Sequence, residues 1–340
     1  MKVAKILLIL ILCHNGFVSG AETLVPAEIY GAISGYILSG RYDMAKDVAD
    51  RLITAHPDEP VGPLLKASVL QYECIDYEDY SGGEEFEELL DKAEKNARIR
   101  ISMDGSDLWA RYFLYAVNGL RGARASISGQ LVYGVVKVRS SALGMEKIIS
   151  DDSEFYDAYL MFGSYRFWKS FALGRAALLP FIDDESNIGI SGVKKAIDNG
   201  VLTGPLSNTV LIEILLANNP ELAVELAEKM FGQYPSCRLF AWQLGEGYKK
   251  LGCFEDAERI FTGIAESMRE DEFDDGSGVV RSWWKLAVLA KSVGKKEECI
   301  YYCNKIIDLG EKRGEKNSVY ERQRERIEKA LRMKEAFENE

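Results

Sequence analysis

The side chains that most often perform catalysis are scarce in this sequence. Its 340 residues include two histidines, His14 and His56. His56 precedes Pro57 at the expected end of a helix, where a histidine suits the negative end of the helix dipole. This scarcity argues against a histidine-rich zinc site or an HExxH motif, and it leaves a catalytic dyad only if His56 serves it.

Carboxylates are abundant and gather in three runs. The runs are Glu84, Glu85, Glu87 and Glu88; Asp183, Asp184 and Glu185; and Asp271, Asp274 and Asp275 before Gly276. The first run lies near a helix start, where the dipole favours negative charge, and the third lacks the alternate spacing of an EF-hand calcium loop. The chain also lacks a GxxxxGKS/T phosphate loop and a GxSxG motif. We therefore predict no catalytic residue, no metal site and no cofactor.

The overall charge is acidic, with a formal net charge of −11. Nucleic-acid binding needs a basic face that displaces counterions from phosphates, so we predict no nucleic-acid partner. One central stretch is an exception in its cations, which are Lys95, Arg98, Arg100, Arg111, Arg121, Arg124, Lys137 and Arg139. Two interpretations stay open: these cations are solvated or paired with acidic neighbours, or they form a patch for an anionic surface or an acidic partner.

The first twenty residues have the features of an export signal. Lys2 and Lys5 precede an apolar run over residues 6–12, and small residues follow at 18–21. This run is too short to cross a bilayer, which takes about 20 apolar residues. We predict a signal peptide at 1–20, cleaved after Gly20 or Ala21, and an exported protein that is periplasmic or secreted, with envelope association left open. No later segment is apolar enough to span a membrane, so we predict that the protein is not an integral membrane protein.

The cysteines beyond this signal do not form a recognisable redox or metal motif. They are Cys74, Cys237, Cys253, Cys299 and Cys303, an odd number that cannot all pair within one chain. Cys299 and Cys303 share one face of an expected helix as small buried residues. A bridge between Cys237 and Cys253 stays open.

The elements that would position these residues are repeated helix pairs. The clearest unit contains Leu244, Gly245, Tyr248, Gly252, Phe254, Ala257 and Phe261. This spacing resembles the tetratricopeptide repeat (TPR), a helix–turn–helix of about 34 residues. Ala241 and Arg269 depart from the family pattern, which often has tryptophan and proline at these places.

Further units follow from the same register. The clearest are 26–59, 204–237, 238–271 and 280–313, with a degenerate middle at 60–203 and a polar capping helix at 316–340. The last full unit is displaced by an insertion of about eight residues around the acidic loop at 272–278. The resemblance implies an all-α fold: one right-handed TPR-like α-solenoid over 21–340, with about seven helix pairs and a C-terminal cap.

The resemblance also implies where a partner would bind. The first helix of each TPR unit lines the concave surface, and the matching places here are Leu239, Trp242, Glu246 and Lys249, then Arg281, Trp284, Val288 and Lys291. Trp242 and Trp284 fall on the same place of neighbouring units, as an aromatic interface anchor would. The alternative is that both indoles pack against the preceding repeat.

Three function classes follow from this organisation. The leading one is an exported TPR scaffold that binds a protein or peptide through its concave surface, without catalysis and with an unknown oligomeric state. A second is a helical-toroid carbohydrate-active enzyme with two carboxylates facing one cleft. A third is a periplasmic small-ligand carrier or transport accessory protein, in which Tyr165, Trp168 and Phe171 line a pocket instead of packing in a helix core.

Overall fold

The computed structural model describes residues 27–79, 82–175, 184–271, 276–313 and 318–338. Within these ranges it contains fifteen α-helices, one short 3₁₀ turn and no strand, which confirms the all-α prediction. The predicted signal peptide at 1–20 lies outside the described residues. None of the helices in these ranges combines the length and apolar composition needed to cross a membrane.

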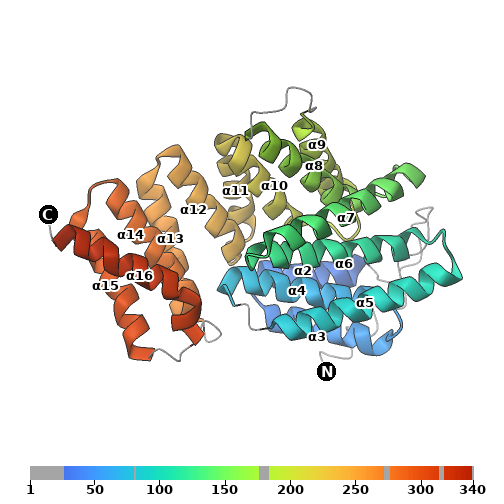
Figure 1. Cartoon of the computed structure of the whole chain (residues 1–340), viewed down its shortest axis with the longest axis horizontal. Coiled ribbons are helices and arrows are strands. Elements are labelled where there is room, and N and C mark those ends of the chain that lie inside the picture. Colours follow the sequence, from blue (N-terminus) through green and yellow to red (C-terminus); the bar gives the residue numbers. More distant parts are fainter. Residues whose placement is uncertain (1–26, 80–81, 176–183, 272–275, 314–317, 339–340) are drawn as a thin grey trace.

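The helices follow one another with short connections (Figure 1). They are α2 (Ala27–Leu38), α3 (Tyr42–Ala55), α4 (Val61–Tyr77), α5 (Gly83–Met103), α6 (Leu108–Ile127), α7 (Leu131–Asp151), α8 (Ala158–Arg175), α9 (Ser186–Asn199), η2 (Pro205–Ser207), α10 (Asn208–Asn218), α11 (Pro220–Gln233), α12 (Arg238–Leu251), α13 (Phe254–Glu270), α14 (Ser277–Ser292), α15 (Lys296–Arg313) and α16 (Ser318–Glu338).

The helices form two layers. Each helix packs against the next along the chain, and even-numbered helices also contact one another, as in α2–α4, α4–α6, α6–α8, α8–α10, α10–α12 and α14–α16. Odd-numbered helices make no comparable contacts with one another in the part of the chain that the structure describes. A curved array brings its inner helices closer together than its outer ones. The even-numbered helices are therefore the inner layer.

Small residues set the distance between the paired helices. Ala45, Ala223 and Ala257 are completely buried, and a Cβ atom built on Gly245 of α12 would lie 2.6 Å from the ring of Phe261 on α13. Such a close approach needs a residue without a side chain. Gly245 and Ala257 belong to the repeat spacing that the sequence analysis identifies.

Gly252 ends α12 in a left-handed conformation, with φ 77°. A residue with a Cβ atom is strained there, whereas glycine is not. Gly40 and Gly294, the corresponding turn residues of two other predicted units, also have positive φ values. The turn chemistry that the sequence predicts is therefore present at all three places.

The prediction for α6 and α7 was wrong at their junction. The sequence indicates helices over 107–120 and 126–149, whereas α6 continues to Ile127 and α7 begins at Leu131. Glycines on both helices are contact points: a Cβ atom on Gly122 would lie 2.8 Å from the backbone nitrogen of Val138 and 2.9 Å from the carbonyl oxygen of Gly134. They let the two helix backbones touch without interrupting either helix.

The array curls until distant inner helices meet. The end of α4 contacts α12 and α14, and one continuous apolar core extends from Ile33 on α2 to Leu289 on α14. A second apolar cluster joins α14, α15 and α16. Part of the inner surface is therefore filled by the protein's own side chains.

Two glycine-to-alanine substitutions test the close contact at Gly245, because they should change the free energy of unfolding in opposite directions. We expect Gly245→Ala to lower the free energy of unfolding by about 1–3 kcal/mol, because the added methyl group collides with a rigid ring. Gly263, in the middle of α13, has no atom within 4 Å of an added Cβ, so Gly263→Ala should raise it by about 0.5–1 kcal/mol. Urea unfolding monitored by circular dichroism measures both; an unchanged or stabilised Gly245→Ala variant contradicts the packing described.

Candidate functional site

The predicted concave residues of α12 are partly covered. Leu239 and Trp242 are buried, with 5% and 4% of their surface exposed. The guanidinium of Arg281 lies over the Trp242 indole, 4.0 Å from the ring centroid. Trp242 thus packs inside the protein, between Arg281 of α14 and Phe261 of α13, and is not displayed on an open surface. Glu246 and Lys249, further along α12, are half-buried.

The predicted residues of α14 become more exposed along the helix. Trp284 is half-buried and packs against the second apolar cluster, Val288 is half-buried, and Lys291 is exposed. The Lys291 ammonium lies over the Phe337 ring of α16, 5.7 Å from its centroid. The two tryptophans therefore do not form one open aromatic ladder.

An ion pair connects α12 and α14. Lys285 of α14 forms an ion pair with Glu246 of α12 at 2.5 Å, and Lys249 approaches the same carboxylate at 3.4 Å. Burial works to raise the pKa of Glu246, but the two lysines outweigh it and the pKa is lowered. Glu246 is thus a charged anchor between neighbouring inner helices.

The C-terminal end of α4 covers the N-terminal ends of α12 and α14. We call residues 75–78 together with Arg238, Arg281 and Arg326 the α4 clamp. Arg238 donates to Asp76 at 2.7 Å and to Asp271 at 2.8 Å, and its guanidinium lies over the Tyr77 ring, 4.9 Å from the centroid. Asp76 is 1% exposed and is separated from Arg238 by 162 positions in the sequence. One arginine therefore ties two distant helices together.

Glu78 receives the other two arginines. It caps α4 in a left-handed conformation, with φ 53°. Arg326 of α16 donates to its carboxylate at 2.9 Å, and Arg281 lies 3.4 Å from the same carboxylate. Arg281 also donates to the carbonyl oxygen of Ile75 at 3.1 Å, which satisfies a backbone acceptor that a helix end leaves open.

Hydrogen bonds from two tyrosines complete the clamp. Tyr42 of α3 donates to Asp76 at 3.0 Å, and Tyr77 donates to Asp271 at 2.7 Å. Burial and the adjacent Asp76 raise the pKa of Tyr42, so its hydroxyl stays protonated. Asp76 and Asp271 both contact Arg238. They therefore act as arginine partners, not as a proton-donating acid and a base of the glycosidase kind.

Several members of the acidic runs have cationic partners. Glu85 pairs with Lys66, Glu87 with Arg121, and Glu185 with Arg166 and Lys169. Asp183, Asp274 and Asp275 lie outside the described residues. No group of three or more potential metal ligands occurs within the described ranges.

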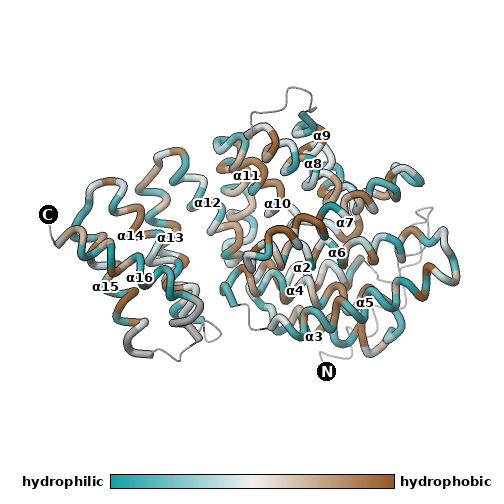
Figure 2. The backbone as a smooth tube through the Cα atoms, viewed as in Figure 1, coloured by the Kyte–Doolittle hydropathy of each residue, from teal (hydrophilic) through white to brown (hydrophobic). Residues whose placement is uncertain are grey.

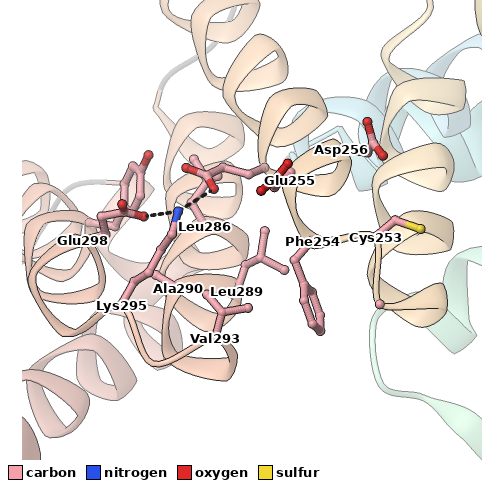
Figure 3. A pocket seen from close by; sticks show the side chains of 13 residues that line it. Cys253, Phe254, Glu255, Asp256, Leu286, Leu289, Ala290, Val293, Lys295 and Glu298 are labelled. Carbon is pink, nitrogen blue, oxygen red and sulfur yellow. Dashed lines mark hydrogen bonds and ion pairs between the residues drawn. The ribbon is translucent and has the colours of Figure 1, made fainter.

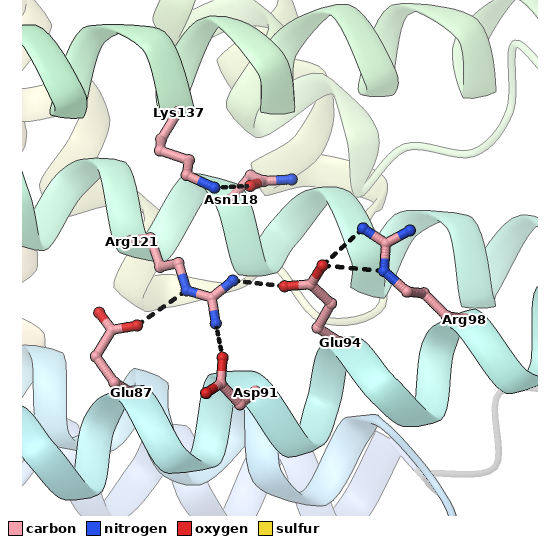
Figure 4. Close-up of polar contacts among 7 residues, drawn as sticks. All are labelled: Glu87, Asp91, Glu94, Arg98, Asn118, Arg121 and Lys137. Carbon is pink, nitrogen blue, oxygen red and sulfur yellow. Dashed lines mark hydrogen bonds and ion pairs between the residues drawn. The ribbon is translucent and has the colours of Figure 1, made fainter.

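Half of the central cations form ion pairs with carboxylates. Arg121 is 7% exposed and contacts Glu87, Asp91 and Glu94 of α5, while Arg98 binds Glu94 on the same helix (Figure 4). The remaining members are placed as follows: Arg100 binds Glu59 and Asp107, Arg111 binds Asp151, Arg124 is buried over the Phe86 ring, Lys137 donates to Asn118, and Lys95 and Arg139 are exposed. The pairing interpretation thus describes Arg98, Arg100, Arg111 and Arg121.

A pocket of about 430 Å³ lies on the C-terminal part, between the α12–α13 turn and the α14–α15 turn (Figure 3). Phe254 and Leu289 lie at its floor, and Lys295 bridges Glu258 and Glu298 at its edge. The exposed thiol of Cys253 also lines it. Cys253 and the buried Cys237 are both free, so the bridge between them that the sequence left open is absent.

The aromatic residues considered for a ligand pocket lie along α8. Phe171 stacks on Phe167, with ring centroids 5.9 Å apart, and Trp168 packs edge-on against Phe171 at 5.6 Å. Trp168 is 40% exposed and Tyr165 is half-buried. These contacts are those of a helix surface whose rings pack on one another.

Comparison with known proteins does not identify a family for this chain. No protein-family model matches the chain. No curated protein matches it at a significant level.

The sequence analysis missed the α4 clamp. Its members Asp76, Tyr77, Glu78, Arg238 and Arg326 belong to no motif, but their positions carried a signal. Acidic residues at the C-terminal end of a helix and an arginine as the first residue of another helix both oppose the helix dipole. A charge that opposes the helix dipole needs a partner of opposite charge elsewhere. Here Arg238 is that partner for Asp76.

The clamp predicts a specific acid sensitivity. Burial works to raise the pKa of Glu78, but the hydrogen bond from Arg326 and the charges of Arg281 and Arg326 lower it. A carboxylate with a lowered folded-state pKa stabilises the protein above its unfolded pKa, and this contribution is lost as the pH falls through the folded value. Glu78→Gln should therefore be less stable than wild type at pH 7, and the difference should shrink below about pH 4.

Urea unfolding at several pH values measures this difference. Glu88→Gln is the matched control, because Glu88 is exposed on α5 and carries the same change in charge. The control should track wild type at every pH. A gap for Glu78→Gln that stays constant down to the acid limit would show that the arginines do not hold Glu78 as a carboxylate.

Proposed function

We propose that this protein is an exported, non-catalytic scaffold of the TPR type that binds a protein or peptide. In this proposal the pairs are α2–α3, α4–α5, α6–α7, α8–α9, α10–α11, α12–α13 and α14–α15, stacked with a right-handed twist, and α16 is the cap. A stacked array of this kind offers long surfaces without any bond chemistry. The signal peptide predicted at 1–20 is the reason for proposing that the protein is exported.

The main support for this proposal is one hydrogen bond. The side-chain amide of Gln243 on α12 donates to the carbonyl oxygen of Thr209 on α10 at 2.7 Å, and these residues are 34 positions apart. The two helices are successive inner helices, so the contact joins equivalent places of neighbouring units in the TPR register. The left-handed Gly252 and the close contact at Gly245 support the same register.

The clamp narrows the proposed binding surface. It covers the N-terminal ends of α12 and α14, whereas exposure increases toward their C-terminal ends. Lys249, Trp284, Val288 and Lys291 are the predicted concave residues that remain accessible there. The proposed contact is therefore made by the C-terminal halves of the two inner helices, with two lysines beside an indole and a valine.

Charge reversal at this surface tests the proposal. We expect Lys249→Glu/Lys291→Glu in the chain 21–340 to reduce capture of its partner from an envelope extract by at least about tenfold, because both ammonium groups border the accessible inner surface. Lys194→Glu/Lys229→Glu is the control with the same change in charge, since both lysines are exposed on the odd-numbered helices α9 and α11. Quantitative mass spectrometry of the bound proteins measures the capture. Identical partner lists and amounts for the two double variants contradict the proposed surface.

A further inference from the structure

Helix α7 exposes an unusual amount of apolar surface in its first half. The exposed fractions are 64% for Leu131, 82% for Val132, 61% for Val135 and 60% for Val136. Figure 2 shows this part of α7 in the colour of hydrophobic residues. Leu143, two turns further on, is 43% exposed. Contiguous apolar surface of this kind marks an interaction site in soluble proteins.

The opposite face of α7 already serves the core. Ser141, Met145 and Ile148 are completely buried, and α7 packs against α6 and α8. A helix that covers a core normally presents polar residues to water. In the first half of α7 Gly134 is buried, whereas Leu131, Val132, Val135 and Val136 are exposed, so packing against the core does not account for these apolar side chains.

The exposed side chains are spaced for another helix. Val132, Val136, Arg139 and Leu143 succeed one another at intervals of four, three and four residues. This is the spacing of a coiled-coil seam, in which each side chain inserts between four residues of a facing helix. We call these four residues the α7 seam.

The cations of this face differ from the other central cations. Arg139 and Lys147 are exposed, and neither forms an ion pair with a carboxylate of the described residues. Arg98, Arg100, Arg111 and Arg121 are matched by carboxylates of α5 and its neighbours. In a chain with a formal net charge of −11, two unmatched cations beside an apolar seam favour an acidic partner at this place.

We propose that the α7 seam binds an amphipathic helix of a partner protein, with an apolar stripe that packs on Val132, Val136 and Leu143 and carboxylates that meet Arg139 and Lys147. The inference rests on the proposed scaffold function and names a second contact, on the outer layer. A second copy of this chain fits less well, because antiparallel pairing centred on the α7 seam would set the two Arg139 side chains about 4.5 Å apart along the helix axis, with an apolar residue and no carboxylate facing each. An anionic lipid surface would repel a chain with this net charge.

A designed peptide pair tests the chemistry directly. The acidic probe is a fluorescein-labelled helix of four heptads with leucine at a and d and glutamate at e and g, where the glutamates hinder pairing with itself. The second probe has lysine at e and g and the same leucines. Fluorescence anisotropy with the chain 21–340 should show saturable binding of the acidic probe and at least about tenfold weaker binding of the lysine probe.

Variants locate the site. Val132→Glu/Val136→Glu should weaken binding of the acidic probe by at least about tenfold, and both valines are exposed enough for the fold to persist. Arg139→Glu/Lys147→Glu should reverse the preference toward the lysine probe. Leu222→Glu is the control, because Leu222 is 49% exposed on another helix, and it should bind as wild type does.

Several results would overturn the proposal. They are no saturable binding, equal binding by the valine variant, no reversal by the charge variant, self-association in sedimentation velocity that the valine variant abolishes, or seam-dependent binding to phosphatidylglycerol vesicles. The inner-surface lysine variants keep the two proposals apart. If they lose partner capture while the seam variants bind the probe as wild type does, the scaffold proposal stands and the α7 seam proposal falls.

Discussion

The contact between Arg238 and Asp76 is the interaction on which the rest of this structure depends. Both side chains are almost inaccessible to water, and a buried charge is tolerable only with a partner and hydrogen bonds. The carboxylate ends α4 and the guanidinium begins α12, so their pairing requires the helices between them to bring these two ends together. Tyr42 donates a further hydrogen bond to Asp76, and Asp271 accepts one from Arg238. The curl of the array follows from this requirement.

That curl decides which surfaces are left for other molecules. The clamp covers the N-terminal ends of α12 and α14, and Trp242 is buried beneath Arg281. This leaves the C-terminal halves of α12 and α14 more exposed than their N-terminal halves, and on the outer layer the α7 seam is exposed. Ion pairs are also unevenly distributed among the cations. Carboxylates of α5 pair with Arg121, whereas Arg139 and Lys147 on α7 have no such partner in the described residues. Local charge, more than total charge, distinguishes these surfaces.

The all-helical fold and the close contacts within one helix pair could be predicted because their determinants are local. Gly252 ends a helix and Gly245 admits an aromatic ring, and both effects act within one helix pair. The clamp could not be placed in the same way, because its partners lie 162 positions apart and no motif connects them. The misplaced charges of Asp76 and Arg238 signalled a need for partners without identifying them. The boundary between α6 and α7 was misplaced because the close contact at Gly122 depends on a neighbouring helix, which the local sequence does not identify.

A double-mutant cycle at Asp76 and Arg238 tests the central claim most directly. Asp76→Asn, Arg238→Gln and the double variant would be compared with wild type by urea unfolding at neutral pH and constant salt. The account predicts that each single change costs about 3–5 kcal/mol, because it leaves a buried charge unmatched. It also predicts that the double change costs less than the sum by about 1–3 kcal/mol. Additive effects, or single changes near zero, would show that the pair does not hold α4 against α12.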